Sequence, residues 1–241
     1  MLTGAPLCAV LFDVGGTLVD ETGDYVFSLQ VVKDVLTREL GREVSEEEIE
    51  SARDRAISAW APSFTKAVLW HFLSPDIERT KAVYEEVVSR IFAHREEVTL
   101  MEGVKEVIPK LARRYKLAVA GNQPLEMIEK LKKTGVLEHF TAVVLSSEIR
   151  FHKPDSRFFL EVCERISVLP ENCCMVGDRL DNDIYPANVL GMRTIWVRTG
   201  PHAVQRPRVP EDVPDAIVGS MREVLEVIEG WERKSSMVEG S

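Results

Sequence analysis

The sequence has no long uninterrupted apolar segment, no block of basic residues, and only four cysteines in 241 residues. A membrane-spanning helix needs roughly 18 or more consecutive apolar residues, and a secretory signal needs a basic segment followed by an apolar one. Neither pattern is found, so we expect a cytoplasmic protein that does not enter a membrane. The length allows one domain or two.

Positive charge is also scarce. The formal net charge is -9 at pH 7, with Lys and Arg spread along the chain. Proteins that bind nucleic acid or anionic membranes generally carry a basic patch, so we expect neither partner. A small anionic substrate stays possible if a local cation or metal offsets the negative field. The sequence does not define an oligomeric state.

The cysteines show no spacing typical of a zinc site. All four lie in apolar stretches, which favours buried thiols that pack as small hydrophobic side chains: Cys8, Cys163, Cys173 and Cys174. Two of them are neighbours in a predicted strand, so their side chains point to opposite faces and do not bridge.

One short stretch near the N-terminus organises the rest of the chain. Residues 7–12 form a continuous apolar run, typical of a central strand in a parallel sheet covered on both faces. The run ends in Asp13, with Gly15 and Gly16 close behind it. Ligands of open α/β sheets bind at the carboxyl ends of the strands. Asp13 is therefore either a functional carboxylate or only the end of a strand before a glycine turn.

Residues 21–97 show helical periodicity and no convincing strand. The stretch 25–40 carries apolar residues from Val26 onward along one helical face. Ser45 and Glu48 form a capping box for a second helix, and two more helical stretches follow. This block predicts an all-helical module inserted after the first strand.

From Gly103 onward, strands and helices alternate, which predicts a parallel sheet with right-handed crossovers. Strands are expected at 116–120, 142–145, 173–176, 194–197 and 216–218. Residues 200–214, rich in proline and basic side chains, are predicted to form a surface loop, and residues 233–241 to be disordered.

Polar groups follow several of these strands, where the sheet would gather them beside Asp13. Gly121 and Asn122 come directly after a strand, and N–H groups at the start of the next helix can hold an anion. Lys153 precedes another predicted helix. Taken alone, a Lys-Pro turn before a helix is usually a solvated turn without function.

The segment 178–183 carries three carboxylates directly after a buried strand. These three carboxylates would repel one another unless a cation lies among them. An acidic loop after a strand is often only a helix cap. The functional interpretation therefore depends on several polar groups occurring together. A carboxylate, amide donors, a lysine and further carboxylates occur at successive strand ends.

With these residues the sequence resembles the haloacid dehalogenase superfamily, in the branch with a helical cap inserted after the first strand. The matching stretches are 12–18, 153–155 and 176–184. The resemblance implies an α/β fold in which residues 1–20 and 98–232 form a Rossmann-like parallel-sheet core. Residues 21–97 would form an all-helical cap.

The resemblance also implies a Mg²⁺-dependent hydrolase acting on a small phosphorylated metabolite. Asp13 would be the nucleophile that forms an aspartyl-phosphate. Together with Asp178 and the main-chain carbonyl of Gly15, it would hold Mg²⁺. A divalent cation and an ammonium remove the repulsion between a carboxylate and a phosphate dianion.

The remaining site residues have supporting roles in this family. Lys153 would neutralise the nucleophile and the phosphoryl group. Gly121 and Asn122 would bind the phosphate beside Lys153. Thr17 and Asp183 would support these groups, with Asp183 orienting Lys153 or a metal-bound water.

Two positions depart from the pattern of phosphatases in this family. Such enzymes carry a second aspartate two residues after the nucleophile, as the general acid for the leaving group, and Ser or Thr at the phosphate-binding turn. Here these positions are Gly15 and Gly121. A positioned acid or base typically contributes about 10² to 10⁴ in rate. Candidate substitutes are Asp20, Asp24 and His71.

Three other functions fit parts of the same pattern. Phosphonate carbon–phosphorus hydrolases of this superfamily also lack the second aspartate and need a cap lysine, for which Lys33 and Lys66 are available. Dehalogenation of 2-haloacids uses the same nucleophile without a metal, and the acidic segment 178–183 argues against it. A non-catalytic phosphate-binding or regulatory protein would keep the anion site without turnover.

Overall fold

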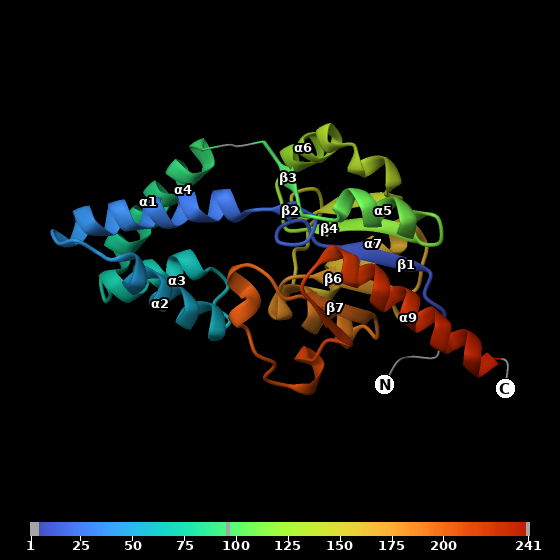
Figure 1. Cartoon of the computed structure of the whole chain (residues 1–241). Helices are drawn as coiled ribbons and strands as arrows, with labels where there is room; N and C mark the ends of the chain where they lie inside the picture. Colours follow the sequence, from blue (N-terminus) through green and yellow to red (C-terminus); the bar gives the residue numbers. More distant parts are fainter. Residues whose placement is uncertain (1–4, 95–96, 240–241) are drawn as a thin grey trace. The chain divides into compact units, whose positions relative to one another are not determined.

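The structure is a computed structural model that describes residues 5–94 and 97–239. The chain divides into two compact units, and Figure 1 labels most of their helices and strands. The sheet unit holds the residues up to Asp20, Val98–Ala203, and those from Pro207 on. The helical unit holds Glu21–Glu97 together with Val204–Arg206, a short piece of the loop predicted at 200–214.

The sheet unit is built on a six-stranded parallel sheet with the order β5-β4-β1-β6-β7-β8. Its strands are β1 (Ala9–Phe12), β4 (Lys116–Gly121), β5 (Ala142–Leu145), β6 (Cys173–Gly177), β7 (Arg193–Val197) and β8 (Ala216–Val218). Phe12 of β1 lies level with Val119 of β4 and Val176 of β6. The carboxyl ends of the three central strands therefore meet at one edge, and the predicted α/β fold is confirmed.

Alternate residues of each strand pack into two separate apolar cores, one on each face of the sheet. Val10 and Phe12 join the core beneath α5 (Val104–Ala112), α6 (Glu126–Thr134) and α9 (Met221–Glu239). Ala9 and Leu11 join the core beneath α7 (Ser156–Ile166) and α8 (Tyr185–Val189). The apolar run predicted for the first strand follows from this arrangement, because a strand covered on both faces has no solvent-facing side.

The cysteines divide between these cores and the surface. Cys173 and Cys174 lie in opposite cores, as predicted for neighbours on a strand, and Cys163 is also buried. All are free thiols. Cys8 is exposed, contrary to the prediction, because it lies just before β1 at the amino edge of the sheet.

Two features of the sheet unit differ from the expectation. The short strands β2 (Val19–Asp20) and β3 (Thr99–Leu100) pair antiparallel where the chain leaves and re-enters the unit, and two-residue strands leave no periodic pattern. Helix α9 continues to Glu239, whereas the sequence predicted disorder from residue 233. Residues 233–239 contain no glycine or proline that would end a helix.

The helical unit contains α1 (Thr22–Leu40), α2 (Glu46–Ser58), α3 (Phe64–Leu73) and α4 (Ile77–Ala93). Their apolar faces share one core that includes Leu36, Leu69 and Val87. The capping box of Ser45 and Glu48 forms at the start of α2 as predicted. Val26 is 60% exposed, because the buried face of α1 begins only at Val31.

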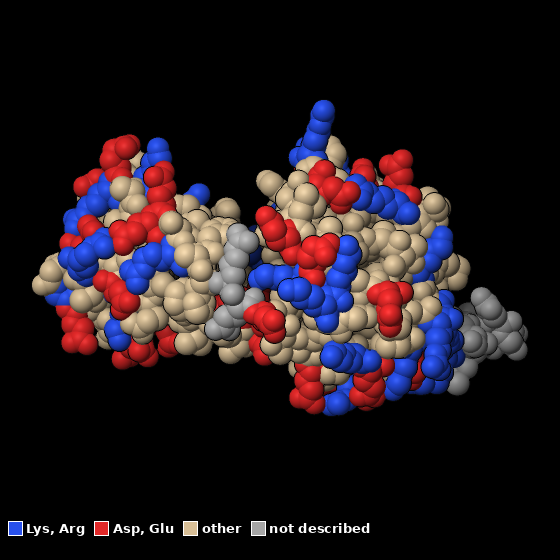
Figure 2. Space-filling view, turned by 90° about the horizontal axis from the view of Figure 1, so that it is seen from above, with Lys and Arg blue, Asp and Glu red and all other residues tan. Residues whose placement is uncertain are grey.

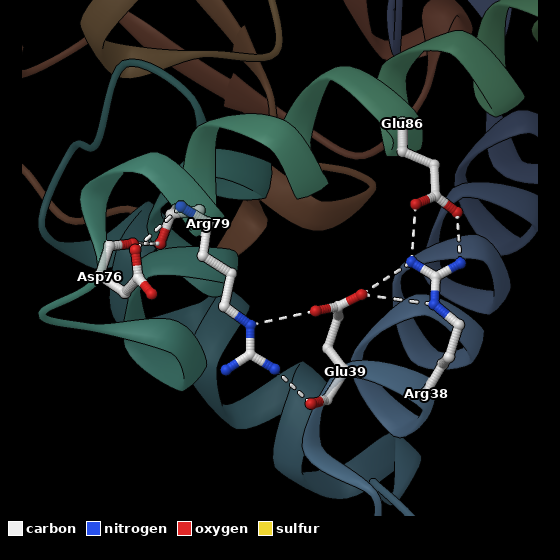
Figure 3. A network of polar contacts seen from close by, with 6 residues as sticks. Arg38, Glu39, Asp76, Arg79 and Glu86 are labelled. Atoms are coloured by element: carbon white, nitrogen blue, oxygen red, sulfur yellow. Dashed lines mark hydrogen bonds and ion pairs between the residues drawn. The ribbon is translucent and has the colours of Figure 1, made fainter.

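A network of exposed ion pairs links α1 to α4 in the helical unit (Figure 3). Arg38 donates to both carboxylate oxygens of Glu86 at 2.7 Å and to Glu39 at 2.9 Å. Arg79 in turn donates from Nε to Glu39 at 3.0 Å. Exposed pairs of this kind contribute little singly, but together they restrict how the two helices lie against each other.

The molecular surface carries both signs of charge. On the face shown in Figure 2, basic and acidic side chains are interspersed. Within the described ranges, no helix combines the length and apolarity needed to cross a membrane.

The core of the helical unit generates a stability prediction. Leu36→Ala removes a side chain with no exposed surface, so we expect the free energy of unfolding to fall by about 2–5 kcal/mol. Leu160→Ala is the matched control, because Leu160 lies in a helix but is 44% exposed. Urea titrations that give equal losses for the two variants would contradict the assigned core.

Candidate active site

Asp13 is held at the carboxyl edge of the sheet by its own backbone. It follows β1 directly, and its N–H donates to the carbonyl of Val176 in β6 at 3.0 Å. The next residues fold back at once, with the N–H groups of Leu18 and Val19 donating to the carbonyl of Val14 at 2.9 and 2.8 Å. Asp13 is only 9% exposed. These hydrogen bonds fix the main chain from which its carboxylate extends.

The Lys153 ammonium joins two carboxylates. Its Nζ lies 2.6 Å from Oδ1 of Asp13 and 2.6 Å from Oδ1 of Asp183, and all three side chains are buried. Burial works against the charge on Lys153, but the two carboxylates outweigh it and raise the pKa of the ammonium above its usual range. The lysine therefore remains charged at neutral pH.

Asp178 follows β6 and sits in a tightly packed place. The indole N–H of Trp196 on β7 donates to the main-chain carbonyl of Asp178 at 2.8 Å. Gly16 has a φ of +63°, and a Cβ built on it would lie 2.7 Å from Oδ2 of Asp178. Glycine at position 16 therefore serves both the turn and the close approach of the carboxylate.

Asp183 is brought back to the same edge by the π-helical turn η3 (Leu180–Ile184). Its Oδ2 accepts from the N–H of Arg179 at 3.1 Å. A Cβ on Gly177 would lie 2.5 Å from the Asp183 carboxylate, so only glycine fits at the end of β6. Burial raises the pKa of Asp183 to about 7; the Asp13 carboxylate adds to the increase and Lys153 opposes it.

These carboxylates form a candidate metal centre. In the described part of the chain, Asp13, Asp178 and Asp183 are buried, and one oxygen from each lies within 4.8 Å of the others. An all-oxygen donor set suits a hard cation such as Mg²⁺. With all four carboxylates ionised, Asp181 included, the cations Lys153 and Arg179 leave two negative charges for a divalent ion to balance. The residues present therefore fit the metal that the sequence implies.

The structure brings most of the predicted site residues to this edge. Gly15 follows Asp13 by two residues and forms an isolated bridge with Val19. Thr17 is fully buried in the same turn. Gly121 ends β4, and Asn122 beyond it is bonded through its side chain to the backbone of Lys153.

The other candidates have different surroundings. Asp20 pairs through its backbone with β3, and Asp24 lies in the first turn of α1 in the helical unit. His71 Nε2 lies 3.2 Å from an Arg55 guanidinium nitrogen. The two candidate cap lysines are engaged within their own unit, since Lys33 pairs with Glu46 at 3.3 Å and the Lys66 ammonium lies 4.6 Å from the ring centre of Tyr84.

Sequence reasoning missed two residues of the site. Arg179 donates to Asp181 at 3.0 Å from Nε and 2.6 Å from a terminal guanidinium nitrogen, which places a second cation beside the acidic segment. The place of Arg179 between Asp178 and Asp181 in the sequence was a usable signal for this pair. Trp196 had none, because its contact with Asp178 depends on the neighbouring positions of β6 and β7.

Several known proteins are similar to this chain. The chain is 32% identical over 228 residues to a glyceraldehyde 3-phosphate phosphatase of Methanopyrus kandleri, covering 91% of this chain and 96% of that protein. It is 33% identical over 178 residues to a phosphoserine phosphatase of Thermus thermophilus, covering 70% and 67% respectively. The crystal structure of a HAD phosphatase from Thermococcus onnurineus superposes with a TM-score of 0.60 at 27% identity, covering 92% and 98%.

The family assignment follows from a match along most of the sheet unit. A family model described as haloacid dehalogenase-like hydrolase matches residues 10–197. This range runs from β1 to the end of β7 and includes Asp13, Lys153 and Asp178. The chain belongs to the haloacid dehalogenase-like hydrolases.

Proposed function

We propose that this hydrolase is a Mg²⁺-dependent phosphatase that cleaves a small phosphorylated metabolite through an aspartyl-phosphate on Asp13. The observation that carries the proposal is the Lys153 ammonium, 2.6 Å from both Asp13 and Asp183 beside a buried carboxylate triad. The relatives named as phosphatases support the same reaction class. We assign the sheet unit as the catalytic core and the helical unit as a cap that selects the substrate.

The roles follow from charge and position. Asp13 attacks phosphorus, and the oxygen–phosphorus bond to the leaving group breaks in line with the attack. Lys153 neutralises the carboxylate and the incoming phosphoryl oxygens, while Asp183 holds the ammonium in place. Bound Mg²⁺, held by Asp13, Asp178 and the Gly15 carbonyl, would supply the remaining positive charge. Water then attacks phosphorus, releasing inorganic phosphate and regenerating the Asp13 carboxylate.

Gly15 limits the range of substrates. It supplies no side chain to protonate a leaving group, and general acid catalysis typically contributes about 10² to 10⁴ in rate. We therefore infer that the natural substrate has a leaving group that departs with little protonation, or that the substrate supplies the proton itself. The metal ligand assigned to residue 15 is a backbone atom, which glycine retains.

Gly121 has a steric explanation. A Cβ at this position would lie 2.7 Å from Cγ2 of Val14 and 3.4 Å from Cδ2 of Leu145. Val14 is fully buried and β-branched, so it has little freedom to move aside. The Ser or Thr carried by other family members therefore does not fit beside this valine.

A second function is favoured by one observation, the absence of an acidic side chain at residue 15. A protein that binds a phosphorylated ligand without turnover would keep Lys153 and the carboxylates and would not need an acid at residue 15. This alternative predicts binding of Mg²⁺ or inorganic phosphate with no hydrolysis. The first experiment below separates the two functions, because only the phosphatase would hydrolyse p-nitrophenyl phosphate.

The first prediction concerns the nucleophile. Wild-type protein is expected to hydrolyse p-nitrophenyl phosphate, whose leaving group needs little protonation, with Mg²⁺ and not with EDTA. Asp13→Asn should lower kcat by at least about 10³-fold because the attacking carboxylate is lost. Circular dichroism checks that the variant is folded. Equal turnover by the two proteins would overturn the assignment of Asp13.

The second prediction concerns the missing acid. Gly15 is not among the residues with a positive φ, so an aspartate meets no backbone penalty there. We expect Gly15→Asp to raise kcat for a phosphate ester with a poor leaving group on the order of 10²-fold. The same variant should change p-nitrophenyl phosphate hydrolysis much less. A wild type that is inert while Gly15→Asp is active would reject the phosphatase proposal for this chain.

The third prediction tests the contact between Val14 and Gly121. Gly121→Ser should lower the free energy of unfolding by about 1–3 kcal/mol through overpacking. Val14→Ala makes room for the new side chain, so the double variant should lose less stability than the sum of the two single losses. Additive losses in urea titrations would show that the two positions do not share this space.

A further inference from the structure

Asn122 holds the backbone of Lys153 from two sides. Its side-chain Nδ2 donates to the Lys153 carbonyl at 2.9 Å, and its Oδ1 accepts from the Lys153 N–H at 2.9 Å. The two residues are 31 positions apart in sequence and lie in the same unit. One planar amide thus fixes the peptide groups on both sides of the Lys153 Cα.

Lys153 depends on such an anchor because it does not belong to a strand or a helix. It lies in the turns between β5 and α7, whereas Asp13 directly follows the central strand. Its side chain must nevertheless reach two buried carboxylates at once, each at 2.6 Å. A long flexible side chain keeps that geometry only if its main chain is held still.

We propose that Asn122 is a positioning residue for Lys153 and does not contact the phosphate through its side chain. The inference rests on the proposed function, in which Lys153 neutralises the reacting groups. Oδ1 and one N–H of the Asn122 amide are engaged by the Lys153 backbone, and we assign the binding of an anion at the end of β4 to the main-chain N–H groups of the turn. The sequence predicted Asn122 as a phosphate-binding residue. In this proposal only its main chain could bind phosphate, because its side chain holds Lys153.

The position of Asn122 separates its effect on catalysis from its effect on stability. The residue is exposed, so removal of its side chain leaves no buried cavity. A displacement of about 1 Å at a reacting centre costs on the order of 10²-fold in rate. Asn122→Ala is therefore expected to lower kcat for p-nitrophenyl phosphate by about 10- to 100-fold with a small change in KM.

The matched control is Asn188→Ala. Asn188 also uses one side-chain amide on two backbone groups, with Nδ2 donating to the carbonyls of Glu211 at 2.7 Å and Val213 at 3.0 Å. It lies in α8, and its Oδ1 accepts from Thr194 near the start of β7, away from the carboxyl edge. This variant loses three side-chain hydrogen bonds, one more than Asn122→Ala, and should keep the wild-type kcat.

A double-mutant cycle with Lys153→Met tests whether Asn122 acts through the lysine. Calorimetry with orthovanadate and Mg²⁺ measures affinity for a phosphoryl-transfer analogue in every variant, including inactive ones. We expect Asn122→Ala to weaken orthovanadate binding when Lys153 is present and to have no further effect in the Lys153→Met background. Such non-additivity is the signature of residues that act as one unit.

Two results would overturn the proposal. One is a kcat for Asn122→Ala within about twofold of the wild type, since a lysine held by other contacts would not need the amide. The other is an equal loss of orthovanadate affinity in both backgrounds, which means that Asn122 contacts the anion itself. If the wild type has no turnover, the phosphatase proposal fails, and the calorimetric cycle still decides the role of Asn122.

Discussion

The sheet unit depends on one buried cation held between two carboxylates. A charge removed from water without a partner costs several kcal/mol, so Lys153 is tolerated because Asp13 and Asp183 each approach it to 2.6 Å. The carboxylates in turn repel each other and depend on the ammonium. Three separate segments of the chain must therefore end at the same edge of the sheet, and the tight contacts around them follow from this requirement.

The constraint explains why several neighbouring positions accept few residue types. Gly177 leaves room for the Asp183 carboxylate, and Gly16 leaves room for Asp178. Trp196 fixes the main-chain carbonyl of Asp178 from the adjacent strand. Each contact removes a degree of freedom from a charged group, which is how a site is organised before a ligand arrives.

Local patterns were enough to predict the class of the fold and to select the residues proposed for the site. The buried strands appear as apolar runs because both faces of the sheet are covered, and each run stops where a polar side chain reaches the carboxyl edge. Asp13 and Asp178 could be selected in this way without knowing the strand order, whereas Lys153, in a turn before a helix, stood out only in combination with them. The helices of the second unit could also be predicted, since all four carry apolar faces and Ser45 caps one of them.

Contacts between distant segments could not be predicted from the same patterns. The amide of Asn122 and the backbone of Lys153 meet only because β4 and the turns after β5 converge, and no spacing in the chain encodes that approach. The pairing of β2 with β3 and the contact of Trp196 with Asp178 are equally non-local. At Asn122 the sequence singled out the residue, but the atoms that its side chain bonds to depend on the tertiary structure.

The two glycines that depart from the family pattern therefore have different meanings. From the sequence alone, Gly15 and Gly121 together were compatible with a site that has lost its chemistry. The structure accounts for Gly121 by packing, because Val14 fills the space that a hydroxyl-bearing side chain would take. Loss of function is therefore not needed to explain Gly121. Gly15 is then the one of these two glycines that bears on whether the protein is catalytic. Under the proposed function, the buried lysine, the carboxylate triad and the amide holding the lysine would serve phosphoryl transfer, and the proton for the leaving group would come from a source other than residue 15.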